Sequence, residues 1–382
     1  MHKIYLSYNN IVSSFGFNSN DAVTKIKDEI TSLKLVNNKA LMPESFYSSL
    51  VDKEKLEKEF ASLNSKNKYT TLEKMMILSL SKVISASKTK ITERTGLIIS
   101  TTKGNIDALE VNSTHNEDKA YLSELGKAVK THFGFLKEPL VLSNACVSGV
   151  LATSIAKRLI KQDLFDSVFI VSGDLVTKFT VSGFNSFQAL SNEPCKPYSK
   201  NRTGINIGEV AASILVTKDI SNLAPEAVEI LGDGTANDAN HISGPSRTGE
   251  GLFRSVNSAL KEAKILASDI DYISAHGTAT IFNDEMEAIA FDRLQMNKTP
   301  LNSLKGYFGH TLGASGLLET IIGMHSMHKN ILFASLGFDE IGVSKTINVI
   351  KNSAAKNLTI FLKTASGFGG CNTAAIFKKV KH

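Results

Sequence analysis

Residues 139–150 read Pro-Leu-Val-Leu-Ser-Asn-Ala-Cys-Val-Ser-Gly-Val, a sharp junction between a strand and a helix. The apolar run 140–143 predicts the strand, and Cys146 is expected to begin a helix that ends at Gln162. A thiol at a helix start lies among free backbone N–H groups and at the positive end of the helix dipole, and both favour the thiolate. The small residues Ala145 and Gly149 are expected to let a substrate approach the sulfur. The alternative interpretation is a buried structural cysteine.

Apolar strands alternate with helices on both sides of this junction. Val168–Val171 and Ala211–Val216 predict two strands that follow it, and Gly96–Ser100 predicts one that precedes it. Thr71–Ser87 has apolar residues at helical spacing and predicts a helix with a buried face. Strands that are apolar throughout and are separated by helices indicate an α/β fold with sheets covered on both faces.

The second half of the chain repeats this alternation of strands and helices. The order strand, Cys146, helix, strand, strand in the first half is matched by strand, His310, helix, strand, strand in the second. We therefore expect a duplicated α/β unit. Residues 1–217 are the expected N-terminal half, which carries Cys146, and residues 218–382 are the expected C-terminal half, which carries His276 and His310.

The first of the two histidines follows an apolar strand directly. His276 lies in the stretch Ala275-His-Gly-Thr-Ala-Thr280, with Asn283, Asp284 and Glu287 behind it. A histidine at a strand end can project into a cleft, and the nearby threonine or acidic side chains are expected to orient its ring. The alternative is an imidazole whose hydrogen bonds are satisfied within the fold.

The second histidine lies in Lys305-Gly-Tyr-Phe-Gly-His-Thr-Leu-Gly-Ala-Ser-Gly316, just before a helix rich in small residues. Lys305 is upstream of His310, and Glu319 is in the helix that follows. A further stretch, Ala365-Ser-Gly-Phe-Gly-Gly-Cys-Asn372, is a turn of small residues whose backbone N–H groups can reach a ligand. Taken alone, each of these patterns also fits an ordinary structural role.

Composition and charge exclude several classes of protein. The 382 residues are 42% hydrophobic and 21% charged, which fits a folded globular chain. The net charge of +6 includes no block of Lys and Arg that resembles a nucleic-acid-binding arm. Cys146, Cys195 and Cys371 lack metal-site spacing and predict neither a disulfide framework nor a zinc site. We expect no membrane insertion and a cytoplasmic location, because there is neither an apolar signal core nor a run of about 18 apolar residues.

The motifs together, in this order, resemble the β-ketoacyl-[acyl carrier protein] synthases of the thiolase superfamily. Three more stretches contribute to the resemblance: Cys195-Lys-Pro-Tyr198, Ile207-Gly-Glu209 and Asp238-Ala-Asn-His-Ile-Ser-Gly-Pro245. The resemblance extends from about Val141 to Phe377. It implies a thiolase-like fold in which duplicated α/β units form a layered α-β-α-β-α arrangement.

The resemblance also implies a reaction and a role for each residue. Cys146 would be the nucleophile that takes an acyl chain from a carrier thioester. His276 and His310 would bind the malonyl thioester carbonyl and stabilise the enolate that is left when carbon dioxide departs. The acyl carbonyl oxygen would lie between the N–H groups of Cys146 and Phe368. Phe368 would also be the gate between the thioester and the acyl pocket.

Four supporting residues follow from the same resemblance. Lys305 and Glu319 would form an ion pair around His310, and Thr278 and Thr280 would line the approach of the phosphopantetheine arm. Because that arm arrives on the carrier protein, we expect no bound cofactor and no metal ion.

Two protein partners are implied by the resemblance. One is an acyl carrier protein, and the other is a second subunit, either another copy of the chain or a chain-length-determining homologue. The carrier is acidic in this family, so a basic docking surface is expected. The candidate residues for that surface are Lys66, Lys68, Lys157 and Arg158.

The chain departs from the family's pattern near the expected acyl pocket. Ser199 and Thr203 stand where the family often has acidic residues, and the segments between Leu190 and Pro197 and before Cys146 are shorter than usual. Fatty-acid elongation is the default pathway. The shorter segments leave a specialised polyketide, polyene or aryl-polyene pathway open, with the chain acting in a heterodimer.

Three rival interpretations remain. A thiolase-type acyl-CoA acyltransferase would normally carry a second cysteine in place of one histidine, and Cys371 lies near that place, although both histidines are present. A non-catalytic chain-length subunit would typically lack the active-site cysteine. A cysteine protease is disfavoured because the two histidines belong to different motifs and no oxyanion glutamine precedes Cys146.

Overall fold

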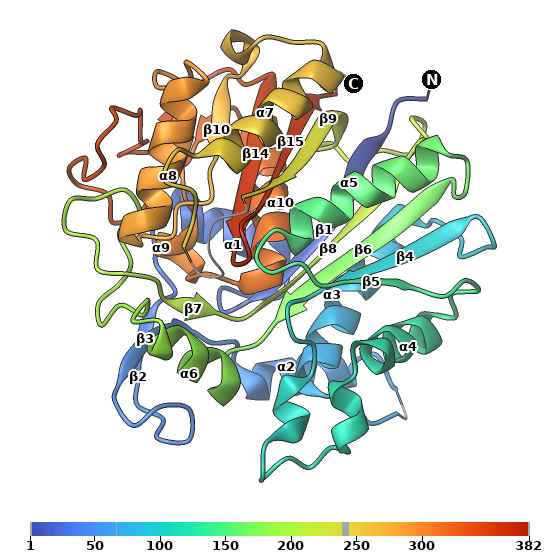
Figure 1. Cartoon of the computed structure of the whole chain (residues 1–382). Coiled ribbons are helices and arrows are strands. Elements are labelled where there is room, and N and C mark those ends of the chain that lie inside the picture. The colour runs from blue at the N-terminus through green and yellow to red at the C-terminus, as the bar shows by residue number, and fades with distance from the viewer. Residues whose placement is uncertain (1, 66, 239–243, 381–382) are drawn as a thin grey trace.

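The computed structural model describes residues 2–65, 67–238 and 244–380. In these ranges ten strands form one sheet in the order β11-β10-β14-β15-β9-β1-β8-β6-β4-β5 (Figure 1). Their bounds are β1 (Tyr5–Ser13), β4 (Thr95–Ser100), β5 (Leu140–Leu142), β6 (Ser167–Asp174), β8 (Val210–Thr217), β9 (Val228–Asn237), β10 (Tyr272–Ser274), β11 (Leu301–Asn302), β14 (Ile360–Gly367) and β15 (Cys371–Lys379).

The sheet consists of two halves with one topology. The N-terminal half has the order β5-β4-β6-β8-β1 and the C-terminal half has the order β11-β10-β14-β15-β9. Numbered by their place in the chain, the strands run third-second-fourth-fifth-first in both halves. In both halves the first three strands of this order are parallel to one another, and the remaining neighbouring pairs are antiparallel. The duplicated unit expected from the sequence is confirmed, and the expected boundary at residues 217–218 falls in the connection from β8 to β9.

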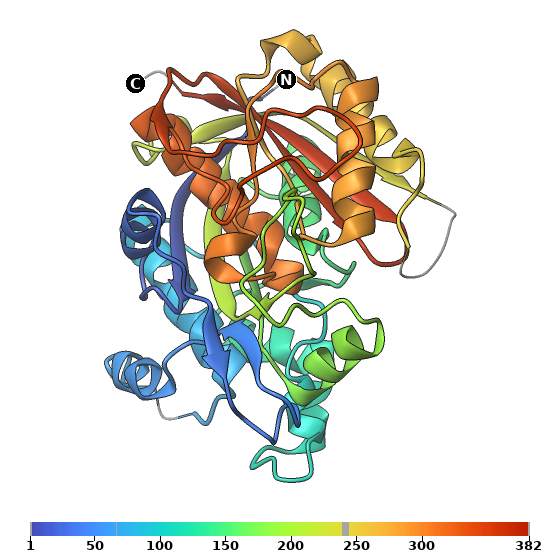
Figure 2. The ribbon, with the colours of Figure 1, turned by 90° about the vertical axis from the view of Figure 1, so that its left-hand side faces the viewer.

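Helices cover both faces of each half and give five layers. Helix α3 (Thr71–Ser87) lies against the outer face of the N-terminal half, and α7 (Glu250–Ala263) lies against the outer face of the C-terminal half (Figures 1 and 2). Between the halves lie α5 (Ser148–Lys161) and α10 (Ser315–Lys329), which pack against each other. Three apolar cores lie between these layers. The predicted α-β-α-β-α arrangement is therefore confirmed.

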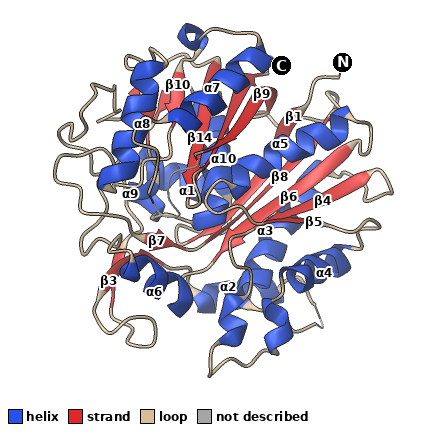
Figure 3. Cartoon of the chain, in the orientation of Figure 1, coloured by secondary structure: helices blue, strands red, loops and turns tan. Residues whose placement is uncertain are grey.

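Smaller elements complete the chain, as the colouring by secondary structure shows (Figure 3). The remaining helices are α1 (Ser19–Lys27), α2 (Lys53–Ala61), α4 (Leu122–Phe133), α6 (Lys178–Ser186), α8 (Ile281–Arg293) and α9 (Lys305–Phe308), and the remaining strands are β2 (Lys34–Val36), β3 (Phe46–Ser49), β7 (Ile207–Gly208), β12 (Ile331–Leu332) and β13 (Ala354–Ala355). Among the described residues, no helix has both the length and the apolar character needed to cross a bilayer.

Local sequence explains why the central elements form. Thr70 and Glu73 make a reciprocal capping box at the start of α3, with the Glu73 N–H donating to Thr70 Oγ1 at 3.1 Å. Every residue of β6 and of β8 is buried, as expected for inner strands that are covered on both faces.

The two central helices meet through a matched pair of glycines. Gly149 is the second residue of α5, and Gly316 is the second residue of α10. A Cβ atom on Gly149 would lie 2.5 Å from the Leu317 nitrogen, and one on Gly316 would lie 2.8 Å from the Val150 nitrogen. Gly149 was expected to make room for a substrate at the sulfur. That expectation is wrong, because Gly149 instead allows close contact between the helix backbones.

A buried ion cluster also ties the two halves together. Lys157 on α5 is 1% exposed, pairs with Asp233 on β9, and lies 2.6 Å from Glu262 on α7. Arg158 pairs with the same aspartate. Lys157 is therefore excluded from a docking surface, and Arg158 is already engaged. Lys68 is exposed, whereas Lys66 lies outside the described residues.

Candidate active site

Cys146 lies on a tight turn just before a central helix. The residue before it, Ala145, has a left-handed backbone with φ of 43°. Helix α5 begins at Ser148 rather than at Cys146 as predicted, and the Ser148 hydroxyl donates to the Ala145 carbonyl at 2.7 Å. The same hydroxyl accepts from the Asn144 N–H at 2.8 Å. The turn therefore holds the sulfur just outside the helix.

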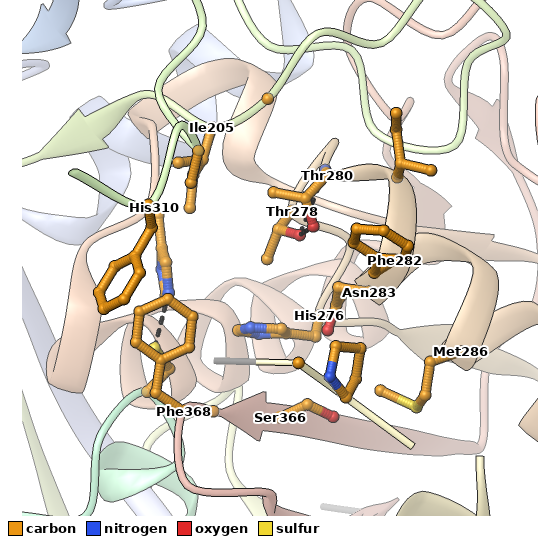
Figure 4. A pocket seen from close by; sticks show the side chains of 18 of the residues that line it. Ile205, His276, Thr278, Thr280, Phe282, Asn283, Met286, His310, Ser366 and Phe368 are labelled. Atoms are coloured by element: carbon orange, nitrogen blue, oxygen red, sulfur yellow. Dashed lines mark hydrogen bonds between the residues drawn. The ribbon is translucent and has the colours of Figure 1, made fainter. Parts of the chain in front are cut away.

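The structure brings the three predicted residues together. His310 Nε2 lies 2.9 Å from Cys146 Sγ, and the rings of His276 and His310 have centroids 5.2 Å apart (Figure 4). All three side chains are buried. One nitrogen or sulfur atom from each lies within 4.8 Å of the others, a spacing that would also suit a metal ion. The set thus joins Cys146 from the N-terminal half to two histidines from the C-terminal half.

Burial keeps these three groups uncharged. It raises the pKa of the Cys146 thiol to about 12, and the nearby Lys103 and Lys305 oppose this only in part. Burial also holds the pKa of His276 and of His310 well below the usual range, and nearby lysines lower both further. The helix start was expected to favour the thiolate, but burial has the larger effect on the pKa of Cys146. These pKa shifts favour a neutral thiol beside a neutral imidazole.

A buried cluster of three charges lies beneath His276. Glu319 binds Lys305 at 2.8 Å through one carboxylate oxygen and Lys363 at 2.6 Å through the other. Lys305 Nζ donates to the His276 carbonyl and lies 3.4 Å from His276 Nδ1. The predicted pair of Lys305 and Glu319 is present, but it contacts His276 rather than His310.

Lys363 is a member of this cluster that the sequence interpretation missed. It is fully buried on β14, and its ammonium donates to the backbone carbonyls of Ser274, Ala275 and Thr364 at 3.1, 3.3 and 2.7 Å. Burial lowers its pKa, and the neighbouring Glu319 opposes that effect. The available signal was one lysine in a strand that is otherwise apolar or small.

Two buried carboxylates hold the turn that carries His276. Glu287 accepts from the His276 N–H at 2.9 Å and from the Gly277 N–H at 2.6 Å. Asp284 accepts from the Thr278 N–H at 2.9 Å. These acids were expected to orient the imidazole ring, and that expectation is wrong. They fix the backbone instead, while the ring faces Lys305.

Two cavities meet at Cys146. The larger, about 370 Å³, is lined by His276, His310, Thr278 and Thr280 as well as Cys146 (Figure 4). The two threonine hydroxyls are 2.8 Å apart. The smaller cavity, about 310 Å³, includes Cys146 but neither histidine.

Phenylalanine side chains divide the two cavities. Phe368, Phe184 and Phe187 line both of them. The Phe368 ring centroid lies 5.6 Å from that of Phe184 and 5.3 Å from that of Phe187. Phe368 thus lies between the two cavities, and its role as a gate stays a prediction. Phe184 and Phe187, on and just after α6, were not predicted.

Asp174, also not predicted, anchors two loops of the site. Its carboxylate accepts from Thr101 Oγ1 at 2.9 Å, from Thr102 Oγ1 at 2.8 Å and from the Gly313 N–H at 2.8 Å. These donors come from the loop after β4 and from the loop that carries His310. Asp174 therefore fixes one wall of the smaller cavity relative to His310.

A duplicated, five-layered α/β fold with a Cys–His–His site where its halves meet defines the thiolase-like class. Within that class, residues 227–339 match the family described as "Beta-ketoacyl synthase, C-terminal domain". A relative from Schizosaccharomyces pombe named "Putative 3-oxoacyl-[acyl-carrier-protein] synthase, mitochondrial" is 30% identical over 322 residues, which are 75% of this chain and 74% of the relative. The chain therefore belongs to the β-ketoacyl-[acyl-carrier-protein] synthase family.

Other relatives match over a shorter length. The 3-oxoacyl-[acyl-carrier-protein] synthase 2 of Rhizobium meliloti is 33% identical over 253 residues, 62% of this chain and 59% of the relative. The enzyme of the same name from Coxiella burnetii is 29% identical, with 63% of the relative covered. The chain thus spans between 59% and 74% of the length of these relatives.

Solved structures share the fold over the whole chain. A ketosynthase in complex with its chain length factor, from Xenorhabdus doucetiae, has a TM-score of 0.87 at 24% identity, with 99% of this chain and 98% of that chain covered. A β-ketoacyl synthase from Burkholderia phymatum has a TM-score of 0.85 at 22% identity, with 100% of both chains covered. At these identities the similarity establishes the fold.

Proposed function

We propose that the chain is a β-ketoacyl-[acyl carrier protein] synthase. It condenses an acyl group on Cys146 with malonyl-carrier protein, losing carbon dioxide, in fatty-acid or polyketide chain elongation. The observation that carries this proposal is the 2.9 Å contact between Cys146 Sγ and His310 Nε2, with His276 beside it, where two cavities meet.

Acylation begins from the neutral thiol. His310 Nε2 is close enough to take the Cys146 proton as the sulfur attacks the carrier thioester carbonyl. The new carbon–sulfur bond forms, and the phosphopantetheine thiolate leaves and takes up the proton. The oxyanion of this step would be held by the N–H groups of Cys146 and Phe368. A Cβ on Gly367 would lie 3.0 Å from the Cys146 nitrogen, so these two backbone segments are in contact.

Decarboxylation then uses both histidines as donors. Since the Lys305 ammonium can only donate, the adjacent His276 Nδ1 must accept, and the imidazole proton is left on Nε2. Once Cys146 is acylated and no longer donates to His310 Nε2, a shift of the His310 proton from Nδ1 to Nε2 would supply the second donor. A malonyl carbonyl oxygen between the two Nε2–H groups would then carry the enolate charge as carbon dioxide departs. The enolate carbon attacks the acyl carbonyl on Cys146, and the Cys146 sulfur leaves and is reprotonated.

The two cavities fit the two substrates of this reaction. The larger one carries both histidines and the two threonine hydroxyls, which suits the malonyl group and its phosphopantetheine arm. The smaller one opens from the sulfur away from the histidines, which suits the growing acyl chain. Phe368 stands between them.

The proposed partners are an acyl carrier protein and a second subunit, and the proposed location is the cytoplasm. A second copy would make a homodimer. A similar solved structure is a ketosynthase with its chain length factor, and another is a ketosynthase with an acyl-carrier protein. The shortened segments before Cys146 and before Pro197 favour a specialised pathway with such a heterodimer as the second candidate.

Mass spectrometry of the intact protein tests the proposal. After incubation with acyl-carrier thioesters, the wild-type chain should gain one acyl mass, and Cys146→Ala should gain none. Cys146→Ala should lose condensation but keep some malonyl decarboxylation, whereas His310→Ala should lose both. Full chain extension by Cys146→Ala would refute the nucleophile assignment. Unchanged activity after treatment with a chelator would support a site that works without a metal ion.

A further inference from the structure

Lys103 is the basic side chain that lines the smaller cavity. The cavity wall is otherwise made of apolar or small uncharged residues: Thr102, Ala145, Cys146, Phe179, Thr180, Gly183, Phe184, Phe187, Leu312 and Phe368. Lys103 is partly buried there, among four phenylalanines and beside the reactive sulfur, so a substrate that fills the cavity would remove water from its ammonium.

The loop that carries Lys103 is held in place by hydrogen bonds. Thr102 N–H and Thr102 Oγ1 donate to the buried Asp174 at 3.0 and 2.8 Å. The Gly104 N–H donates to Thr101 Oγ1 at 3.0 Å, and Ser143 Oγ donates to the Thr102 carbonyl at 2.9 Å. The position of Lys103 relative to Cys146 is therefore fixed by the same aspartate that anchors the His310 loop.

The Lys103 ammonium has unused hydrogen-bonding capacity. It donates to Thr102 Oγ1 at 2.9 Å, and that hydroxyl in turn donates a hydrogen bond to Asp174. Within the described ranges, Lys103 forms no ion pair with a carboxylate. Two of its three N–H groups thus remain available to whatever enters the cavity.

The nature of the acyl chain decides whether this arrangement is favourable. A saturated chain that filled the cavity would displace water from the ammonium and offer nothing in return. A conjugated or aromatic chain presents a π face, which attracts a nearby cation and stacks on phenyl rings. A carboxylated chain would pair with the ammonium, but its charge would then lie against the phenylalanine walls.

We propose that Lys103 is a specificity-determining residue and that the acyl chain held on Cys146 is conjugated or aromatic where it passes the Lys103 ammonium. This inference rests on the proposed function and names its substrate class. Four phenylalanine rings and one unpaired ammonium form a single surface that matches an extended π-system.

The test compares acylation of Cys146 by three carrier thioesters of equal length. The chains are octanoyl, octa-2,4,6-trienoyl and 7-carboxyheptanoyl, and the rate of mass gain is followed on the intact protein. The wild-type chain should load the trienoyl group faster than the octanoyl group by roughly ten-fold. Lys103→Met keeps the length of the side chain and removes its charge, so it should abolish or reverse that preference. Lys178→Met, an exposed lysine on nearby α6 that does not line the cavity, is the matched control and should keep it.

Each outcome decides between alternatives. Equal wild-type rates for octanoyl and trienoyl chains would overturn the inference while leaving the proposed function intact. Fastest loading of the carboxylated chain would overturn it in favour of an anionic substrate. If none of the three chains acylates Cys146, the proposed function fails and the inference fails with it. A thermal unfolding curve for Lys103→Met that matches the wild type would show that any change in preference does not come from misfolding.

Discussion

The connection from the third strand to the central helix occurs in both halves of the fold, but it carries different residues in each. In the N-terminal half, β5 leads through Cys146 into α5, and in the C-terminal half, β11 leads through His310 into α10. The two helices begin alike, with Ser148-Gly-Val-Leu in α5 and Ser315-Gly-Leu-Leu in α10. The next residue differs, because Ala152 in α5 is matched by Glu319 in α10. The surroundings differ accordingly: α5 has an alanine where α10 has a carboxylate held between two lysines.

This difference separates two tasks. Burial raises the pKa of the Cys146 thiol, so in the proposed reaction the sulfur becomes nucleophilic when His310 takes its proton. On the other side, the buried charges fix the backbone around His276 and decide which of its ring nitrogens carries the proton. The N-terminal half therefore supplies a buried thiol, and the C-terminal half supplies the imidazole beside it and the charges that place His276.

Removing the charge at the centre of the C-terminal cluster should have the largest effect. Glu319→Gln leaves two buried ammonium groups without a carboxylate, and we expect a loss of about 3 kcal/mol in the free energy of unfolding. The displaced Lys305 should also release His276, so decarboxylation should fall. Thermal unfolding and carbon dioxide release would measure the two effects. Glu340→Gln, at an exposed pair with Lys200, is the control and should leave stability nearly unchanged.

If Glu319→Gln were as stable as the wild type, the cluster of Glu319, Lys305 and Lys363 would not be what stabilises the connection from β11 to α10. The distinction between the two halves would then have to rest on other residues.

Widening the contact between the two central helices should have the next largest effect. Alanine at Gly149 or Gly316 would press a Cβ against backbone at 2.5 or 2.8 Å, and such overpacking costs about 1–3 kcal/mol. Acylation should slow as well, since the turns that carry the sulfur and the imidazole lead directly into these helices. Denaturant unfolding and acylation rates would report both effects. A matched change, Gly183→Ala in α6, has no atom within 4 Å of the new Cβ and should not destabilise the fold.

Loss of one histidine donor should change the chemistry more than the fold. His276→Ala removes one of two N–H groups proposed to stabilise the enolate, which should lower the rate of malonyl decarboxylation by about 10²–10³-fold. Acylation of Cys146 should be much less affected, because His310 remains beside the sulfur. An unchanged decarboxylation rate would remove His276 from the mechanism.

Alkylation of the resting thiol tests its charge state without changing any residue. With its pKa raised to about 12, Cys146 is a neutral thiol at neutral pH, and the thiolate fraction grows as pH rises. Its rate of reaction with iodoacetamide, read by peptide mass spectrometry, should rise about ten-fold per pH unit from pH 7 to 10. A plateau near neutral pH would instead reveal a thiolate–imidazolium pair, and the proposed uncharged resting state would be wrong.

The sequence was sufficient for the parts of the site that depend on short contiguous patterns. Cys146, His276 and His310 each occur in a strand-to-turn motif, and the alternation of strands and helices predicts the duplicated layers. The sequence was insufficient where distant segments converge. The roles of Lys363 and Asp174 depend on contacts with elements that are distant in the sequence. The high pKa of Cys146 depends on burial, which an argument from the local helix dipole does not include.

The glycine contact between α5 and α10 has a consequence for how such an enzyme can change. The spacing of the two helices that follow the nucleophile and the base is set there by main-chain atoms, which cannot adjust by choosing another rotamer. Cavity walls such as those at Phe184 and Lys103 are built from side chains and can be exchanged one at a time. Substitutions in the cavity walls can therefore change the substrate while the spacing of α5 and α10 stays the same.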